Sequence, residues 1–134
     1  MKFMDSDHKQ FYEQKLKELE KYSTVDTYHK SLIYTLGICD TTRKNFNDIF
    51  DMEKDMIISE SLTEAYQTSS SLKVTRLAFN LFNSCVYDNS YDFVNNRVSK
   101  YYTVDEIFAC SYAPYFYQAI CIRYPSYTKK ERKI

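Results

Sequence analysis

Histidines, cysteines and clustered acids are the side chains of this sequence that are able to bind a metal ion. His8 and His29 each stand alone, without a second histidine or a cysteine three or four residues away, and the four cysteines form no C-x-x-C pair. A zinc site needs several such ligands to converge. The acidic run at 51–55 resembles the start of a calcium loop, yet Met56 and Leu62 stand where that loop requires a glycine and a carboxylate. The sequence therefore predicts no metal site.

The sequence also gives no support for nucleophilic catalysis. Gly37 is the only glycine, which excludes the G-x-S-x-G turn around a catalytic serine and the glycine-rich loops that hold phosphate groups. Cys85 and Cys110 have no histidine near them in the chain, so both are expected to be structural thiols. Asp105 and Glu106 fit the first turn of a helix, where the helix dipole favours carboxylates. We predict no catalytic residue and no cofactor, and an enzyme of unknown class is the least favoured alternative.

Two groups of polar side chains remain as candidate binding residues. One face of a predicted helix, opposite to its apolar residues, carries Lys73, Arg76, Asn80 and Asn83. This face either binds an anion, a nucleic acid or an acidic partner, or is simply solvated. Arg123 stands near the end of an otherwise apolar helix, where it either anchors an ion pair or a ligand or interacts with the carbonyl groups at the helix end.

Fourteen tyrosines form a further feature of the sequence. Most of them lie in the second half of the chain or near predicted helix ends, and not all of them fit into a core. Exposed tyrosine offers apolar area and a hydroxyl group at a small cost in conformational entropy, which is typical of protein-binding surfaces. The tyrosines therefore either contact a partner or straddle the edge of the core.

The composition favours helices over strands. Apolar residues make up 44% of the 134 residues, with one glycine and two prolines, and a β-sandwich or barrel needs many turns rich in those two residues. We predict an all-α fold, a compact bundle of five to seven short helices in one domain at 1–128, followed by a basic, flexible tail at 129–134. No apolar signal region or membrane-length run is present, so a cytoplasmic protein without membrane contact is expected.

Apolar periodicity and capping residues place the individual helices. The predicted ranges are 7–21, 25–36, 40–50, 61–68, 74–85, 103–113 and 114–123. Gly37 is expected to end the second helix in a left-handed conformation, and the last helix, apolar on nearly all sides, is expected to be central. Residues 86–100 are predicted to form an irregular connection, with a small hairpin near 92–100 as the alternative.

Three segments of the sequence carry a resemblance to a known family. They read YTLGI and TRKNF at 34–38 and 42–46, VTRLAFNLFN at 74–83, and YAPYF and IRYP at 112–116 and 122–125. Together they resemble an uncharacterised family of small proteins from Firmicutes, whose members also occur on plasmids, prophages and other mobile elements. The resemblance covers most of the chain and implies no activity, cofactor or site residue.

These observations favour a non-catalytic protein that binds another macromolecule. Eighteen basic and eighteen acidic side chains cancel, so the chain lacks the field that attracts nucleic acids or anionic membranes. A protein partner is the favoured prediction. The small size, the missing catalytic motifs and the resemblance to proteins of mobile elements together favour a modulator or inhibitor of a host complex, for example an anti-defence protein that inhibits a CRISPR effector complex. The alternative is a nucleic-acid-associated regulator that binds through Lys73, Arg76 and the basic tail.

Overall fold

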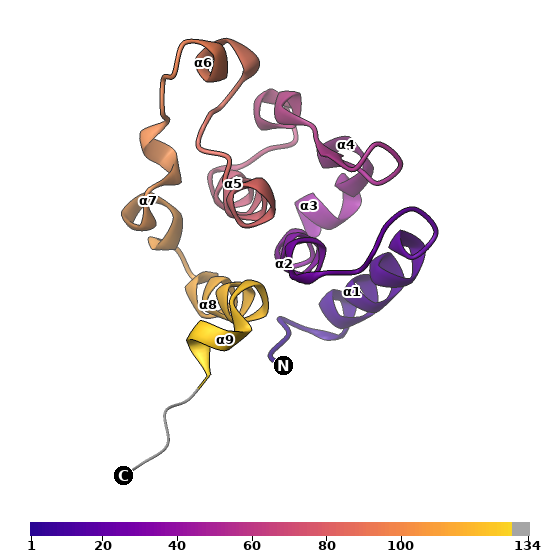
Figure 1. Cartoon of the computed structure of the whole chain (residues 1–134). Helices are drawn as coiled ribbons and strands as arrows, with labels where there is room; N and C mark the ends of the chain where they lie inside the picture. The colour runs from indigo at the N-terminus through magenta and orange to yellow at the C-terminus, as the bar shows by residue number, and fades with distance from the viewer. Residues whose placement is uncertain (130–134) are drawn as a thin grey trace.

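The computed structural model describes residues 1–129, and most of these residues lie in helices (Figure 1). In chain order the elements are α1 (Ser6–Leu19), α2 (Thr27–Leu36), α3 (Asp40–Lys44), α4 (Phe46–Ile49), β1 (Phe50–Asp51), β2 (Met56–Ile57), the 3-10 helix η1 (Ser59–Thr63), α5 (Ser69–Asn83), α6 (Ser90–Val94), the 3-10 helix η2 (Lys100–Tyr102), α7 (Val104–Phe108), α8 (Ala113–Arg123) and α9 (Pro125–Thr128). The all-α class is confirmed. The nine α-helices of the described residues exceed the predicted five to seven, because helices of four or five residues are too short to show an apolar period.

Helix α2 forms the centre of the bundle. All residues from 31 to 39 are buried, and α1, α5 and α8 pack around α2 (Figure 1). The prediction that α8 is the central helix is wrong. One side of α8 buries Phe116, Ala119 and Ile122, whereas Tyr117 on another side is exposed. The nearly all-round apolar pattern therefore belongs to a helix that buries one side and exposes Tyr117, and not to a fully enclosed helix.

Aspartate and threonine side chains fix the starts of the main helices. The carboxylates of Asp5 and Asp26 accept the backbone N–H groups three residues later, at 2.8 and 3.0 Å, and Thr68 with Ser71 forms a capping box at the start of α5. Each cap satisfies a backbone donor that the helix leaves unpaired. The predicted helix at 61–68 is replaced by η1 and a turn at 65–66, and the one at 40–50 is interrupted at Asn45.

Gly37 serves a different purpose from the one predicted. Its φ angle is −81°, so it is not in the left-handed conformation. Instead, α1 passes so close that a Cβ atom on Gly37 would lie 2.7 Å from Cδ2 of His8 and 2.8 Å from Cδ1 of Phe11. Glycine is therefore needed here because it has no side chain, which allows α1 to pack directly on the end of α2.

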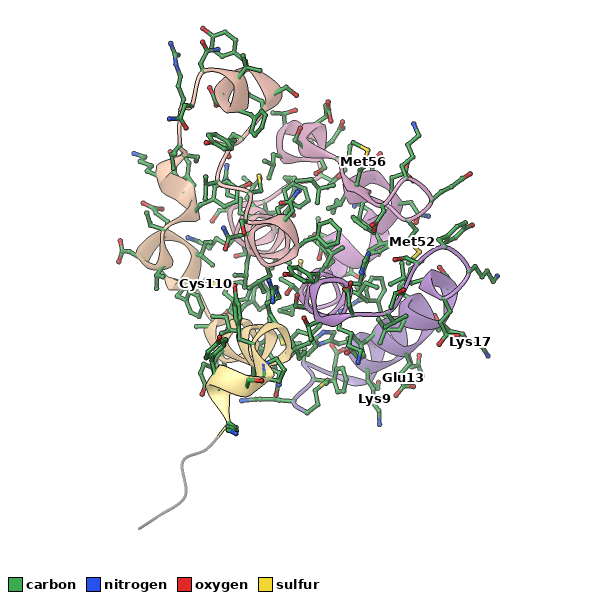
Figure 2. All side chains as sticks on the ribbon, viewed as in Figure 1. Lys9, Glu13, Lys17, Met52, Met56 and Cys110 are labelled. Carbon is green, nitrogen blue, oxygen red and sulfur yellow. The ribbon has the colours of Figure 1, made fainter. Side chains whose placement is uncertain are left out.

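The small hairpin lies at 50–57 and not at the alternative position near 92–100. Strands β1 and β2 pair antiparallel, with Phe50 opposite Ile57, and their turn carries Met52 (Figure 2). The asparagine-rich stretch instead contains α6, whose first turn is capped by Asn89. Asn96 does adopt a left-handed φ of 54°, as turn chemistry anticipates, yet the residues on its two sides do not pair as strands.

Two further predictions concern the ends of the chain and membranes. The predicted basic tail at 129–134 lies, except for Lys129, outside the described residues. Within residues 1–129, no helix combines the length and the apolar character that crossing a membrane requires.

On the outer side of α1, Lys9, Glu13 and Lys17 follow one another at intervals of four residues (Figure 2).

Candidate functional site

The segment at 86–101, called the arm below, extends away from the helical bundle and carries α6 (Figure 1). No residue of α6 is buried. Four apolar side chains of the arm are 62–78% exposed and a fifth is 43% exposed. In chain order these five are Tyr91, Phe93, Val94, Val98 and Tyr101. The arm therefore places a cluster of large apolar side chains in contact with solvent.

Internal hydrogen bonds give the arm a defined shape. The backbone N–H of Ser99 donates to the carbonyl of Val86 at 2.9 Å, which closes the base of the arm. The hydroxyl of Tyr87 donates to Oδ1 of Asn96 at 2.8 Å, and the rings of Tyr87 and Phe93 meet edge to face at 5.4 Å. These contacts tie both sides of the arm to each other and give its backbone a defined course.

Tyr102 anchors the arm to the bundle. Its side chain is buried, and its hydroxyl donates to the carbonyl of Tyr87 at 3.3 Å. Burial raises the pKa of the Tyr102 hydroxyl, so the group stays protonated and remains a donor.

Residues of the predicted polar face of α5 contact the arm, Cys85 just before the arm, and α7. Nε of Arg76 donates to Oδ1 of Asp88 at 3.2 Å, and its guanidinium lies 4.8 Å from the ring centre of Tyr101. Nδ2 of Asn80 donates to the carbonyl of Cys85 at 3.0 Å, and Oδ1 of Asn83 accepts the backbone N–H of the same residue at 3.1 Å. Three of the four predicted residues therefore hold the start of the arm and Tyr101 against α5.

Lys73 contacts α7 instead of the arm. Its ammonium donates to the backbone carbonyl of Glu106. Lys73 and Arg76 line an open pocket of about 430 Å³ together with Leu72, Tyr101 and Glu106. Both cations of the predicted face are thus engaged by acceptors of the chain itself.

A second pocket, of about 270 Å³, lies between the arm, the end of α5 and the segment after β2. Its lining combines the apolar side chains of Ile57 and Phe93 with the amides of Asn83 and Asn89. Ser84, with a left-handed φ of 63°, turns the chain at the end of α5 so that it continues along this pocket. The pocket is smaller than most sites for drug-sized ligands, and its size suits one large side chain.

Arg123 is placed apart from the predicted face of α5. Its Nε donates to the carbonyl of Leu81 in the last turn of α5 at 2.9 Å. The guanidinium lies 3.6 Å from the ring centre of Tyr28 and 4.5 Å from that of Tyr124. The sequence analysis left two roles open, an ion pair or ligand and a contact with the end of its own helix. The structure shows a contact with a carbonyl at the end of α5 instead, and the ligand alternative remains a prediction.

One cluster was missed by the sequence analysis. His29 donates from Nδ1 to Oδ1 of Asp26 at 2.7 Å and from Nε2 to Oδ1 of Asp55 at 2.6 Å. Burial lowers the pKa of His29, but the hydrogen bonds to the two carboxylates outweigh burial and raise this pKa above 6.5. Both ring nitrogens are engaged in hydrogen bonds, so neither is free to act as a general base.

The spacing of Asp26 and His29 at a helix start was a usable signal, whereas Asp55 lies far away in the sequence. Within residues 1–129, no group of three or more His, Cys, Asp or Glu side chains is arranged to hold a metal ion. The four cysteines are free thiols.

Comparison with known proteins gives a family and no activity. A family model described as "Family of unknown function (DUF6075)" matches residues 1–134. The chain belongs to this family, which confirms the resemblance to an uncharacterised family. No curated protein and no solved structure matches the chain.

Proposed function

We propose that this member of the DUF6075 family is a non-catalytic protein-binding module that contacts its partner through the arm. The observation that carries the proposal is the set of five exposed apolar side chains on a segment of defined shape. Apolar area in water costs about 25 cal/mol per Å², and exposed apolar side chains gathered on one segment favour an interaction surface. A partner that covers the arm would remove this cost.

The residue types of the arm also support a protein partner. Tyrosine, phenylalanine and arginine are enriched in protein interfaces, and the arm carries all three in Tyr91, Phe93 and Arg97. The guanidinium of Arg97 lies 5.2 Å from the ring centre of Tyr91, which keeps a cation beside an exposed aromatic ring. The adjacent 270 Å³ pocket offers a place for one side chain of the partner.

A nucleic-acid-associated regulator is the weaker candidate. That function needs cations that are free to contact phosphate groups, whereas Lys73 and Arg76 donate to the carbonyl of Glu106 and to Asp88. The formal net charge of the whole chain is zero. Binding to nucleic acid would weaken steeply with salt, since released counterions drive it, and this property separates it from an apolar protein contact.

The expected biological setting directs the choice of partners. The resemblance to proteins encoded on mobile elements makes host defence complexes, and CRISPR effector complexes among them, the first candidates to test. In this version of the proposal the protein inhibits or modulates the complex by covering one of its apolar surfaces. If the protein neither binds a purified defence complex nor changes its activity, the anti-defence version is removed and the protein-binding module remains.

The proposal is tested by affinity capture with the full chain and matched variants. Phe93→Ser with Val94→Ser removes two exposed apolar side chains from the arm, and Tyr22→Ser removes one that is 55% exposed elsewhere. We expect one protein from a low-GC Gram-positive lysate to bind the wild type and the Tyr22 variant after nuclease treatment, and to be lost with the arm variant. Equal capture by all three proteins would contradict the arm as the binding surface, and capture that disappears with nuclease would support nucleic acid.

A further inference from the structure

Arg123 belongs to a second surface, formed by the start of α2 and the end of α8 together with α9. Tyr28 comes from α2, and Tyr124 and Tyr127 come from the junction of α8 and α9. All three tyrosines are exposed, and the rings of Tyr124 and Tyr127 lie 6.5 Å apart. Arg123 with these three tyrosines is called the Arg123 patch below. Figure 1 shows α8 and α9 at the opposite end of the bundle from α6.

The guanidinium of Arg123 is fixed in position. Its Nε is held by the carbonyl of Leu81, and the ring of Tyr28 lies against it at 3.6 Å, close enough for face-to-face stacking. An arginine held in this way loses little side-chain entropy when it binds a further group, because its planar group is already oriented. The site is therefore preorganised for a ligand that contacts the outer edge of the guanidinium.

The two Nη atoms of Arg123 form that outer edge. Among the described residues they have no hydrogen-bond acceptor, and no acid forms a salt bridge with Arg123. Within residues 1–129, Ser61 Oγ is the one fully buried side-chain nitrogen or oxygen that lacks a hydrogen-bond partner, so the Nη atoms of Arg123 are not among the buried atoms without a partner. The Nη atoms are consequently not fully buried. In the described part of the chain their N–H groups have no acceptor, so a ligand that reaches the edge of the guanidinium can accept from them.

The local charge favours an anion. The sequence from 107 to 129 contains Arg123 and Lys129 and no aspartate or glutamate. The nearest acid to Tyr28 along α2 is Asp26, and its carboxylate is held by His29. An anion at Arg123 would thus be attracted by the arginine without a repelling carboxylate on α8 or α9.

We propose that the Arg123 patch binds a carboxylate, and that the carboxylate is an Asp or Glu side chain of a partner protein. A planar carboxylate accepts two parallel N–H···O hydrogen bonds from a guanidinium, while the tyrosine rings contact the adjoining apolar atoms. One guanidinium balances the single charge of a carboxylate. A nucleic-acid backbone needs repeated cations along its path, and the patch offers a single one between its rings. This inference does not depend on the arm, which lies on another part of the surface.

The test uses NMR spectroscopy of the full chain and a minimal probe. The probe is a short capped peptide with one glutamate between alanines, and the matched probe carries glutamine instead. One carboxylate per molecule avoids the strong attraction that a polyanion would have for any basic segment. We expect the Nε–Hε signal of Arg123 and the ring signals of Tyr28 and Tyr124 to shift and saturate with the glutamate peptide only. Equal shifts with the glutamine peptide, or no shift with either, would overturn the proposal.

Variants and other anions sharpen the result. Arg123→Gln should weaken binding of the glutamate peptide about tenfold, as loss of charge-assisted hydrogen bonds implies. Lys15→Gln removes a cation that also lies over an aromatic ring, that of Phe46, and should leave binding unchanged. Because Arg123→Gln also removes the bond to Leu81, the wild-type Nε shift decides the outcome if that variant is unstable. Inorganic phosphate or a thymidine oligonucleotide that shifts the same signals at lower concentration than the peptide would replace the carboxylate proposal with a phosphate-bearing ligand.

Discussion

His29 and Asp55 are joined by a hydrogen bond of 2.6 Å from Nε2 of the imidazole to Oδ1 of the carboxylate. The bond connects the first turn of α2 with the turn of the β1–β2 hairpin. Asp55 adopts a left-handed φ of 56°, which is uncommon for a residue other than glycine. Since Asp26 binds the other ring nitrogen, the histidine can satisfy both carboxylates only as the imidazolium.

This arrangement predicts that the free energy of unfolding decreases as the pH rises through the folded pKa of His29. The pKa of His29 is raised above its value of 6.5 in the unfolded chain, so its contribution is fully present below pH 6.5 and declines as the pH rises through the folded pKa. We expect His29→Gln to remove this decline, and Asp55→Asn to cost roughly 1–2 kcal/mol at pH 6. Urea unfolding between pH 6 and 9 measures both effects. A parallel pH dependence in the wild type and the His29 variant would contradict the prediction.

His8 is expected to act in the opposite direction. Its Nε2 donates to the carbonyl of Tyr34 at 2.7 Å, and its Nδ1 accepts the backbone N–H of Met4 at 3.0 Å. Burial lowers the pKa of His8, and protonation would place a second N–H group against that of Met4. Stability from neutral His8 is therefore fully present above pH 6.5 and is lost as the pH falls below 6.5 towards the folded pKa. NMR titration should show His8 gaining its proton at lower pH than His29, and the reverse order would contradict both assignments.

Gly37→Ala is predicted to destabilise the protein although its backbone angles suit any residue. The new Cβ would lie 2.7 Å from Cδ2 of His8 and 2.8 Å from Cδ1 of Phe11, and forcing a methyl group into such a contact costs about 1–3 kcal/mol. Ser84→Gly provides the matched comparison. Its φ of 63° favours glycine, so that substitution should stabilise by about 0.5–1 kcal/mol. Thermal and urea unfolding measure both, and a neutral Gly37→Ala would show that α1 readily moves away from α2.

Gly37 also shows which parts of the fold the sequence could predict. The apolar period of α5 and the proline at the start of α8 identified both helices, since both signals depend on neighbouring residues. The predicted range 74–85 nevertheless missed the first residues of α5, which runs from Ser69 to Asn83. The reason for Gly37 is contact with His8, which lies in another helix and far away in the sequence. Local patterns carry no information about such contacts.

The same limit applies to the candidate site. Arg76, Asn80 and Asn83 form a polar helix face by periodicity alone, yet Asp88, the partner of Arg76, belongs to a segment without a period. Cys85, the partner of both asparagines, lies beyond the end of α5, although the period predicted it inside the helix. Their contacts with the arm were therefore not predictable, and neither was the approach of Tyr28 to Arg123 from α2. The abundance of tyrosine did anticipate exposed rings at Tyr91 and Tyr117.

The contact between Arg76 and Asp88 predicts that the arm can be loosened without unfolding the bundle. The side chains of this pair are 13% and 28% exposed, so their charge-assisted hydrogen bond is partly protected from water and contributes about 1–2 kcal/mol. Arg76→Gln removes that bond and the contact of the guanidinium with Tyr101. We expect amide hydrogen exchange to become faster in residues 86–101, while exchange in α2 and α5 stays slow. Lys44→Gln, which breaks an exposed pair with Asp40 in α3, is the control for loss of one positive charge and should change neither region. If the Arg76 variant instead accelerates exchange in α2 as strongly as in the arm, the arm and the bundle unfold as one unit, and Arg76 supports the whole fold rather than the position of the arm.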